Sequence, residues 1–123
     1  MKNKDDVSMK TIAVVEDDQD IGNMIEALLR GEGYGVIRAY SGTEALLVMD
    51  KRRPDLVLLD LMLPGLDGEE VLKSANVPVI VLSAKAAVED KVLNLMNGAR
   101  DYITKPFDNR ELLARIAVQL RGA

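Results

Sequence analysis

Five short apolar runs alternate with five stretches of helical periodicity along this chain, and that alternation restricts its fold more than any other feature. Short runs bounded by turn residues are typical of strands buried on both faces, whereas apolar residues that recur every three to four positions indicate helices. The predicted strands cover residues 11–15, 35–39, 56–60, 77–84 and 101–104. The predicted helices cover residues 19–31, 68–74 and 86–97, with two more that open at Ser41 and Asp108.

Strands that alternate with helices form a parallel sheet covered by helices on both faces, with right-handed crossovers. We therefore predict an α/β fold: a doubly wound, flavodoxin-like sheet of five parallel strands with five helices. We predict the strand order 2-1-3-4-5, which is one of the two common forms of such sheets. In the fourth helix, the spacing of Val88, Val92, Leu93 and Met96 predicts that these side chains face the core.

Acidic or polar residues stand where four of the predicted strands end. The first strand finishes in Glu16 and Asp17, the third in Asp60 and the fourth in Ser83, while the fifth leads into Lys105. All strands of a parallel sheet end at one edge, and in this order the first and third flank the point where strand order reverses, which is where such sheets bind ligands. We therefore expect the three carboxylates to converge on one shallow site, with Ser83 and Lys105 beside it.

Composition narrows the chemistry of that site. The chain has no Cys and no His, which excludes disulfides, thiol nucleophiles, the usual zinc sites and Ser-His or Cys-His catalysis. Three close carboxylates repel one another, and a hard cation such as Mg²⁺, Ca²⁺ or Mn²⁺ relieves that repulsion. Mg²⁺ leaves room for a phosphoryl group, and a carboxylate can act as its nucleophile. The residue types present therefore fit phosphorylation of an aspartate.

Each of these residues also has a plainer interpretation. Acids after a strand commonly cap the next helix, and in that interpretation Asp18 or Gln19 does only this. An Asp before a turn, such as Asp60, is often only a turn former. A lone Ser83 is typically a backbone partner and a lone Lys105 a solvated charge. Their coincidence at one edge of the sheet favours the functional interpretation.

Four motifs resemble those of the receiver domain of two-component response regulators. They are VVEDD (14–18), VLLDLMLPGLDG (57–68), VIVLSAK (79–85) and DYITKPF (101–107), in the order of that family. The resemblance spans residues 10–121, which we expect to form the receiver domain. Residues 1–9 are then expected to be a flexible N-terminal extension, and residues 122–123 the start of a linker to an effector domain outside this chain.

The resemblance implies a role for each site residue. Asp60 would be the phosphoacceptor and would ligate Mg²⁺ together with Asp17 and the main-chain carbonyl of Met62. Glu16 would act through a metal-bound water, and Lys105 would contact the phosphoryl group. Mg²⁺ is the expected ion, and Mn²⁺ would be an acceptable substitute. The domain would be a signalling module that catalyses only its own phosphotransfer and slow autodephosphorylation.

The resemblance also implies a switch and a donor. Ser83 would be the hydroxyl residue of the switch, and its side chain would move to a phosphoryl oxygen. Tyr102 would be the aromatic residue of the switch, and its ring would rotate inward. Considered apart from the resemblance, Tyr102 is an aromatic residue of a strand, and we would expect a neighbouring helix to cover about half of it. The Lys105–Pro106 peptide is cis in the family, so we predict a cis bond here. The donor would be a phosphohistidine on a sensor histidine kinase, since this chain has no His of its own.

The run DYITKPF followed by RELLARI most resembles the transcription-factor subfamily that carries a winged-helix effector domain. The resemblance implies that the protein contacts DNA only through such a domain, which is absent from this chain. This subfamily homodimerises through its fourth helix, fifth strand and fifth helix. Its charged interface positions are matched by Lys91, Asp101, Glu111 and Arg115. Glu111 and Arg115 also have the spacing of a local helical pair that needs no partner chain. The chain departs from the subfamily in two ways. Arg100 reverses the charge at one interface position, and the predicted third helix is shorter than is usual in the family.

Met62 and Lys85 occupy the two positions that flank the path of the attacking water in the family. A bulky apolar side chain and a cation at these positions predict slow self-dephosphorylation.

Two other function classes fit these residues less well. A Mg²⁺-dependent phosphohydrolase of the haloacid dehalogenase type needs an Asp where this chain has Met62. A flavodoxin relative needs a Ser/Thr-rich loop where this chain has acids. A stand-alone receiver domain that acts by binding partners is a variant of the receiver interpretation.

Charge and hydropathy exclude two further kinds of partner for this chain. The net charge of -4 gives no basic surface for nucleic acid. No apolar run approaches the roughly 18 residues that a membrane span needs. A cytoplasmic location is expected.

Overall fold

The computed structural model describes residues 9–65 and 67–121. Five strands pair in parallel in the order β2-β1-β3-β4-β5, which confirms the predicted fold and strand order. The strands are β1 (Thr11–Val15), β2 (Gly35–Ala39), β3 (Leu56–Asp60), β4 (Val79–Ser83) and β5 (Asp101–Thr104). Only β4 differs clearly from its predicted range, because its paired segment is shorter at both ends.

In the described part of the chain, four helices connect successive strands and a fifth follows β5. They are α1 (Gln19–Gly31), α2 (Gly42–Lys51), α3 (Gly68–Ser74), α4 (Val88–Met96) and α5 (Asn109–Arg121). The third helix is short, as predicted. Apart from Met9, the predicted extension over residues 1–9 and the predicted linker at 122–123 lie outside the described residues. None of the described helices has the length and apolar character needed to cross a membrane.

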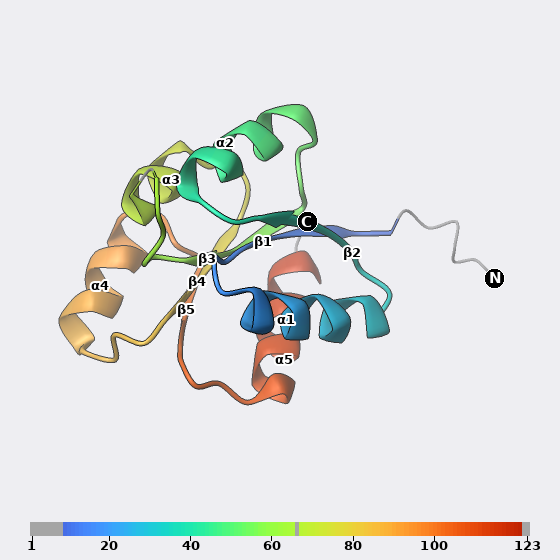
Figure 1. Cartoon of the computed structure of the whole chain (residues 1–123). Helices are drawn as coiled ribbons and strands as arrows, with labels where there is room; N and C mark the ends of the chain where they lie inside the picture. Colours follow the sequence, from blue (N-terminus) through green and yellow to red (C-terminus); the bar gives the residue numbers. More distant parts are fainter. Residues whose placement is uncertain (1–8, 66, 122–123) are drawn as a thin grey trace.

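Helices cover both faces of the sheet (Figure 1), and an apolar core fills each side. Successive strand residues point to opposite faces, so Ile12 and Val14 of β1 lie in the core beneath α1 and α5. Ala13 and Val15 lie in the core shared with α2 and α3. The central residues of β1, β3, β4 and β5 are all buried, whereas those of the edge strand β2 are half-buried. In the four buried strands, polar side chains surface only at the strand ends.

The prediction that Val88, Val92, Leu93 and Met96 of α4 face the core was wrong. Their exposed fractions are 69%, 47%, 49% and 81%, and the buried residue of α4 is instead Asn94. Helical spacing establishes that apolar residues share one side of a helix, but it does not determine which side the sheet covers. In α4 the covered side is the polar one.

Candidate functional site

Three carboxylates meet at the carboxyl ends of β1 and β3. Glu16 and Asp17 directly follow β1, and Asp60 is the last residue of β3. One carboxylate oxygen of each lies within 4.8 Å of the others. Glu16 and Asp60 are buried, with exposed fractions of 2% and 7%, whereas Asp17 is exposed. The predicted convergence is therefore present, and the cluster is open to solvent on the side of Asp17.

Lys105 joins two of these carboxylates. Its Nζ donates to Oε1 of Glu16 at 2.9 Å and to Oδ2 of Asp60 at 3.2 Å. Its backbone N–H donates to the carbonyl of Ser83 at 2.8 Å, which fixes the loop after β5 to the end of β4. The Lys105–Pro106 peptide is cis, as predicted. One ammonium thus contacts two of the three carboxylates, and Asp17 has no such contact with Lys105.

Burial and neighbouring charges shift the proton affinity of both partners. Burial is the largest cause that raises the pKa of Glu16; the hydrogen bond from Lys105 opposes it and the nearby Asp60 reinforces it. Burial alone would lower the pKa of Lys105, but the hydrogen bond to Glu16 and the charge of Asp60 outweigh it, so the pKa of Lys105 is raised. The ammonium is therefore charged at neutral pH.

Both oxygens of the Asp60 carboxylate have a donor. The backbone N–H of Met62 donates to Oδ1 at 3.0 Å, while Lys105 holds Oδ2. The loop that follows is tied to α2, because the N–H of Gly42 donates to the carbonyl of Pro64 at 3.1 Å. Gly65 has a φ of +78°, a conformation that favours glycine. The side chain of Met62 is 65% exposed beside the site.

Ser83, Lys85 and Tyr102 form a connected set of hydrogen bonds next to the carboxylates. Oγ of Ser83 accepts from the N–H of Lys85 at 3.1 Å. The hydroxyl of Tyr102 donates to the carbonyl of Lys85 at 2.8 Å. Tyr102 is buried, with 7% exposed, rather than half-covered. The part played by the Lys85 backbone was missed, because a main-chain carbonyl is the same in every residue type and leaves no signal in the sequence.

The four residues that match dimer-interface positions lie on α4, β5 and α5. Within the chain, Arg115 Nη1 lies 3.0 Å from Asp101 Oδ2 and Nη2 lies 3.0 Å from Glu111 Oε2. The local helical pairing of Glu111 and Arg115 is therefore present without a second chain. Lys91 is half-buried on α4.

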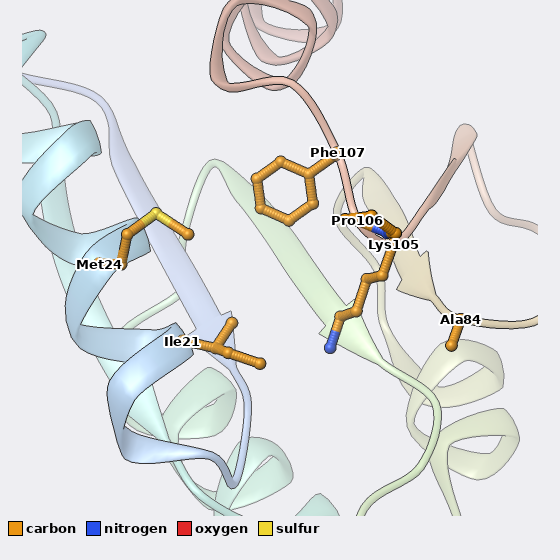
Figure 2. Close-up of a pocket in the computed structure, with 6 residues that line it drawn as sticks. All are labelled: Ile21, Met24, Ala84, Lys105, Pro106 and Phe107. Carbon is orange, nitrogen blue, oxygen red and sulfur yellow. The ribbon is translucent and has the colours of Figure 1, made fainter.

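An apolar hollow of about 370 Å³ opens beside Lys105, between α1 and the loop after β5 (Figure 2). Figure 2 shows the ammonium of Lys105 at its rim. The lining residues are Ile21, Met24, Ala84, Lys105, Pro106 and Phe107. Nothing in the sequence indicated that Ile21 and Met24 lie beside this site, because the proximity of apolar side chains from separate segments appears only in the fold.

The donor set of the cluster fits a hard divalent cation. Three carboxylates supply oxygen ligands only, which is the set preferred by Mg²⁺, Ca²⁺ and Mn²⁺. The exposed position of Asp17 leaves a solvent-facing side, as expected for an ion that keeps several waters. The acidic cluster thus has the character of a divalent metal site.

Comparison with known proteins gives a consistent result. The sequence profile of the response regulator receiver domain family matches residues 12–117. A CheY-like response regulator receiver domain protein from Methanospirillum hungatei is 33% identical, covers 94% of this chain and 96% of its own, and superposes with a TM-score of 0.88. The BeF3-activated N-terminal receiver domain of RstA from Klebsiella pneumoniae is 36% identical, with coverages of 91% and 99% and a TM-score of 0.86.

A third solved structure is similar and contains a metal. The receiver domain of the sensor histidine kinase PA1611 from Pseudomonas aeruginosa holds a magnesium ion coordinated in its active site cleft. It is 32% identical, with coverages of 94% of this chain and 100% of its own and a TM-score of 0.81.

Proposed function

This chain belongs to the response regulator receiver domain family of two-component systems, and we propose that it accepts a phosphoryl group from a sensor histidine kinase onto Asp60. Receiver domains are signalling domains that interact with histidine kinases. The observation that carries the proposal is the position of Asp60, which lies at the end of β3 among two further carboxylates and within hydrogen-bonding distance of the Lys105 ammonium.

We assign the metal role to residues of the acidic cluster. Asp17 and Asp60 would ligate Mg²⁺ directly, the main-chain carbonyl of Met62 would complete the protein ligands, and Glu16 would act through a water. When bound, the ion supplies positive charge that offsets the repulsion between the carboxylates and the incoming phosphoryl oxygens. Mn²⁺ meets the same oxygen-donor requirement. The magnesium held by the receiver domain of PA1611 supports this assignment by similarity.

The transfer itself needs only an in-line carboxylate and charge stabilisation. A carboxylate oxygen of Asp60 forms a bond to phosphorus as the phosphorus–nitrogen bond of the phosphohistidine breaks, and the imidazole leaves with the bonding electron pair. Lys105, whose ammonium already lies at Asp60, is placed to neutralise the phosphoryl oxygens. The chain would catalyse this transfer and its own slow hydrolysis, and no other turnover.

The switch would run through Ser83 and Tyr102. Because Oγ of Ser83 already accepts from the Lys85 N–H, a hydroxyl that turns toward a phosphoryl oxygen changes the hydrogen bonding of the loop before α4. The hydroxyl of Tyr102 donates to the carbonyl of Lys85. When the hydrogen bonding of the Lys85 backbone changes, the side chain of Tyr102 would therefore rotate with it.

The output would pass through the surface of α4, β5 and α5. We propose a phosphorylation-dependent homodimer that uses Lys91, Asp101, Glu111 and Arg115, and control of transcription through a DNA-binding effector outside this chain. Support comes from the match of charged positions to the winged-helix subfamily.

The experiment that tests the central claim is intact-mass measurement after incubation with Mg²⁺ and a small amido or acyl phosphate. We expect one added phosphoryl group on the wild-type chain and none on Asp60→Asn. Asp67→Asn is the matched control, since Asp67 lies in the same loop but is exposed and caps α3, and it should still gain the phosphoryl group. Absence of any addition to the wild-type chain, or addition to Asp60→Asn, would remove Asp60 as the phosphoacceptor.

A further inference from the structure

The apolar hollow between α1 and the loop after β5 adjoins Asp60 through a single side chain. Lys105 lines the hollow, and its Nζ lies 3.2 Å from Oδ2 of Asp60. The volume of about 370 Å³ falls at the lower end of the range for small-ligand pockets, which is roughly 300–1,000 Å³. The hollow therefore has room for a small molecular group directly beside this carboxylate.

The walls of the hollow favour an apolar group. Figure 2 shows Ile21 and Met24 of α1 on one side and Phe107 and Lys105 on the other. Apart from the Lys105 ammonium, the lining side chains carry no charge and no N–H or O–H group. Met24 is 43% exposed, so part of this apolar surface is covered only by water. A hydrocarbon group that displaces that water is stabilised by the hydrophobic effect.

The Lys105 ammonium adds one anion-binding group at the rim. An ammonium has three N–H donors. Two of them are used by Oε1 of Glu16 and Oδ2 of Asp60. The third is left for an anionic oxygen of a ligand, and the side chain keeps 19% of its surface exposed. The charge at the rim and the apolar walls together match a molecule with an anionic head and a hydrocarbon tail.

We propose that the hollow binds the acyl chain of a small phosphodonor, an acyl phosphate with an unbranched alkyl chain. The inference rests on the proposed function, because Asp60 is the acceptor. A carboxylate oxygen of Asp60 forms a bond to phosphorus as the bond between phosphorus and the acyl oxygen breaks, and the fatty acid leaves as a carboxylate with the bonding electron pair. Ile21, Met24 and Phe107 are the specificity residues, since they contact the chain and none of the reacting atoms.

This arrangement predicts a preference for longer acyl chains. Methylenes added at the far end of an unbranched chain leave the carboxylate leaving group chemically almost unchanged, so a difference in rate reports binding of the chain. Each methylene removed from water improves binding about threefold to fourfold. Hexanoyl phosphate has four more methylenes than acetyl phosphate. We therefore expect an advantage of at least about tenfold even though the hollow is open on one side.

The rate of phosphorylation, followed by intact mass in the presence of Mg²⁺, tests the preference. We expect kcat/KM for hexanoyl phosphate to exceed that for acetyl phosphate at least tenfold through a lower KM, because the chain is held equally in the ground state and the transition state. Phosphoramidate, which has no acyl chain, reports whether Asp60 accepts a phosphoryl group at all. Equal values for the two acyl phosphates, with phosphoramidate active, overturn the inference alone. Failure of all three donors overturns the proposed function together with it.

A variant of one wall residue locates the chain in the hollow. Met24→Asn places a polar amide in the wall at an exposed position of α1, so the fold should be retained. We expect the preference for hexanoyl phosphate to fall below about threefold while the rate with phosphoramidate stays the same. Leu47→Asn, at a 60% exposed leucine of α2, is the matched control and should keep the full preference. A preference that persists in Met24→Asn contradicts binding of the chain in the hollow.

Binding can also be measured without transfer. Hexyl phosphate has the same head and a similar tail, but its alkoxide is too poor a leaving group to react. It should inhibit phosphorylation by phosphoramidate at a concentration at least tenfold lower than methyl phosphate does, and it should shift the ¹⁵N resonances of residues 21, 24 and 107. Equal inhibition by the two esters, or shifts confined to other parts of the chain, would refute the proposal.

Discussion

The guanidinium of Arg38 lies against Gly22 of α1, in the space that a Cβ atom at position 22 would occupy. Arg38 reaches this place from β2, and its Nη1 donates to Oδ1 of Asn23 at 2.9 Å and to Oε1 of Glu26 at 3.0 Å. Its guanidinium carbon lies 5.0 Å from the centre of the Tyr40 ring. Gly22 therefore provides room for an arginine between the helix and the edge of the sheet.

Gly22→Ala should destabilise the chain although alanine is the better helix former. Alanine in a helix interior gains about 1 kcal/mol over glycine, but the methyl group displaces Arg38, whose charged hydrogen bonds are each worth about 1.5–3 kcal/mol. We expect the displaced guanidinium to lose one of its two bonds, so that the free energy of unfolding falls by about 0.5–2 kcal/mol in urea denaturation. Gly31→Ala, with no atom in the way at the end of the same helix, should cause no loss.

The Arg38→Ala background provides the stricter test of this prediction. With the guanidinium gone, Gly22→Ala should stabilise the chain, so the sign of its effect should reverse. An equal loss of stability in both backgrounds would show that Gly22 is needed for another reason.

Glu26 should contribute stability that depends on pH. The hydrogen bond from Arg30 and then that from Arg38 hold the pKa of Glu26 below its ordinary value of 4.5. The contribution is therefore complete above the unfolded pKa and is lost as pH falls through the lower folded pKa. Glu26→Gln should cost about 0.5–1 kcal/mol at pH 7, and the difference from wild type should shrink below about pH 4.5. High salt should reduce the difference at pH 7; a difference unaffected by pH or salt would contradict the electrostatic explanation.

The fold and the position of the site followed from the sequence for one physical reason. A parallel sheet buries its strands on both faces and ends them at one edge, so apolar runs locate the strands and the polar residues after them locate the site. Glu16, Asp17, Asp60 and Lys105 come together by that rule alone. Their catalytic roles do not follow from it and remain proposals.

Other features could not be predicted, because they depend on packing between distant segments. The face that α4 turns to the sheet depends on the neighbouring strand and loops, and the apolar spacing of Val88 and Val92 pointed to the wrong one. The contact between Gly22 and Arg38 joins residues whose types alone give no reason to pair. The hydrogen bond from Tyr102 to Lys85 uses a backbone carbonyl, which carries no residue-specific signal.

Mg²⁺ should stabilise the folded chain through the acidic cluster. The three carboxylates lie within 4.8 Å of one another, and a cation that binds only the folded state stabilises it by mass action. At a free concentration ten times its dissociation constant, the expected gain is about 1.4 kcal/mol. Thermal unfolding with and without Mg²⁺ measures the gain. Asp17→Asn should abolish it, whereas Asp20→Asn, in the first turn of α1, should retain it; an equal gain in both variants would place the ion elsewhere.

Arg115 should matter more to dimerisation than to stability. Its pairs with Asp101 and Glu111 are partly exposed, so Arg115→Ala should cost less than about 1 kcal/mol in unfolding. If the phosphorylated chain dimerises through this surface, the same variant should raise the dissociation constant of the dimer about tenfold in sedimentation equilibrium. Arg110→Ala, at an exposed ion pair nearer the start of α5, is the control. An unchanged dimer in Arg115→Ala would exclude this residue from the interface.

Met62 should slow hydrolysis of the phosphorylated chain. Its backbone is fixed to Asp60 by a 3.0 Å hydrogen bond, and its side chain is 65% exposed next to the acidic cluster. An apolar side chain there offers the attacking water no hydrogen bond, whereas the amide of Met62→Asn does. One such bond in the transition state is worth about 1–1.4 kcal/mol, so loss of phosphoryl label should accelerate on the order of tenfold. Met96→Asn, at an 81% exposed methionine of α4, should keep the wild-type rate. If Met62→Asn keeps it too, the side chain of Met62 does not control the lifetime of the phosphorylated state.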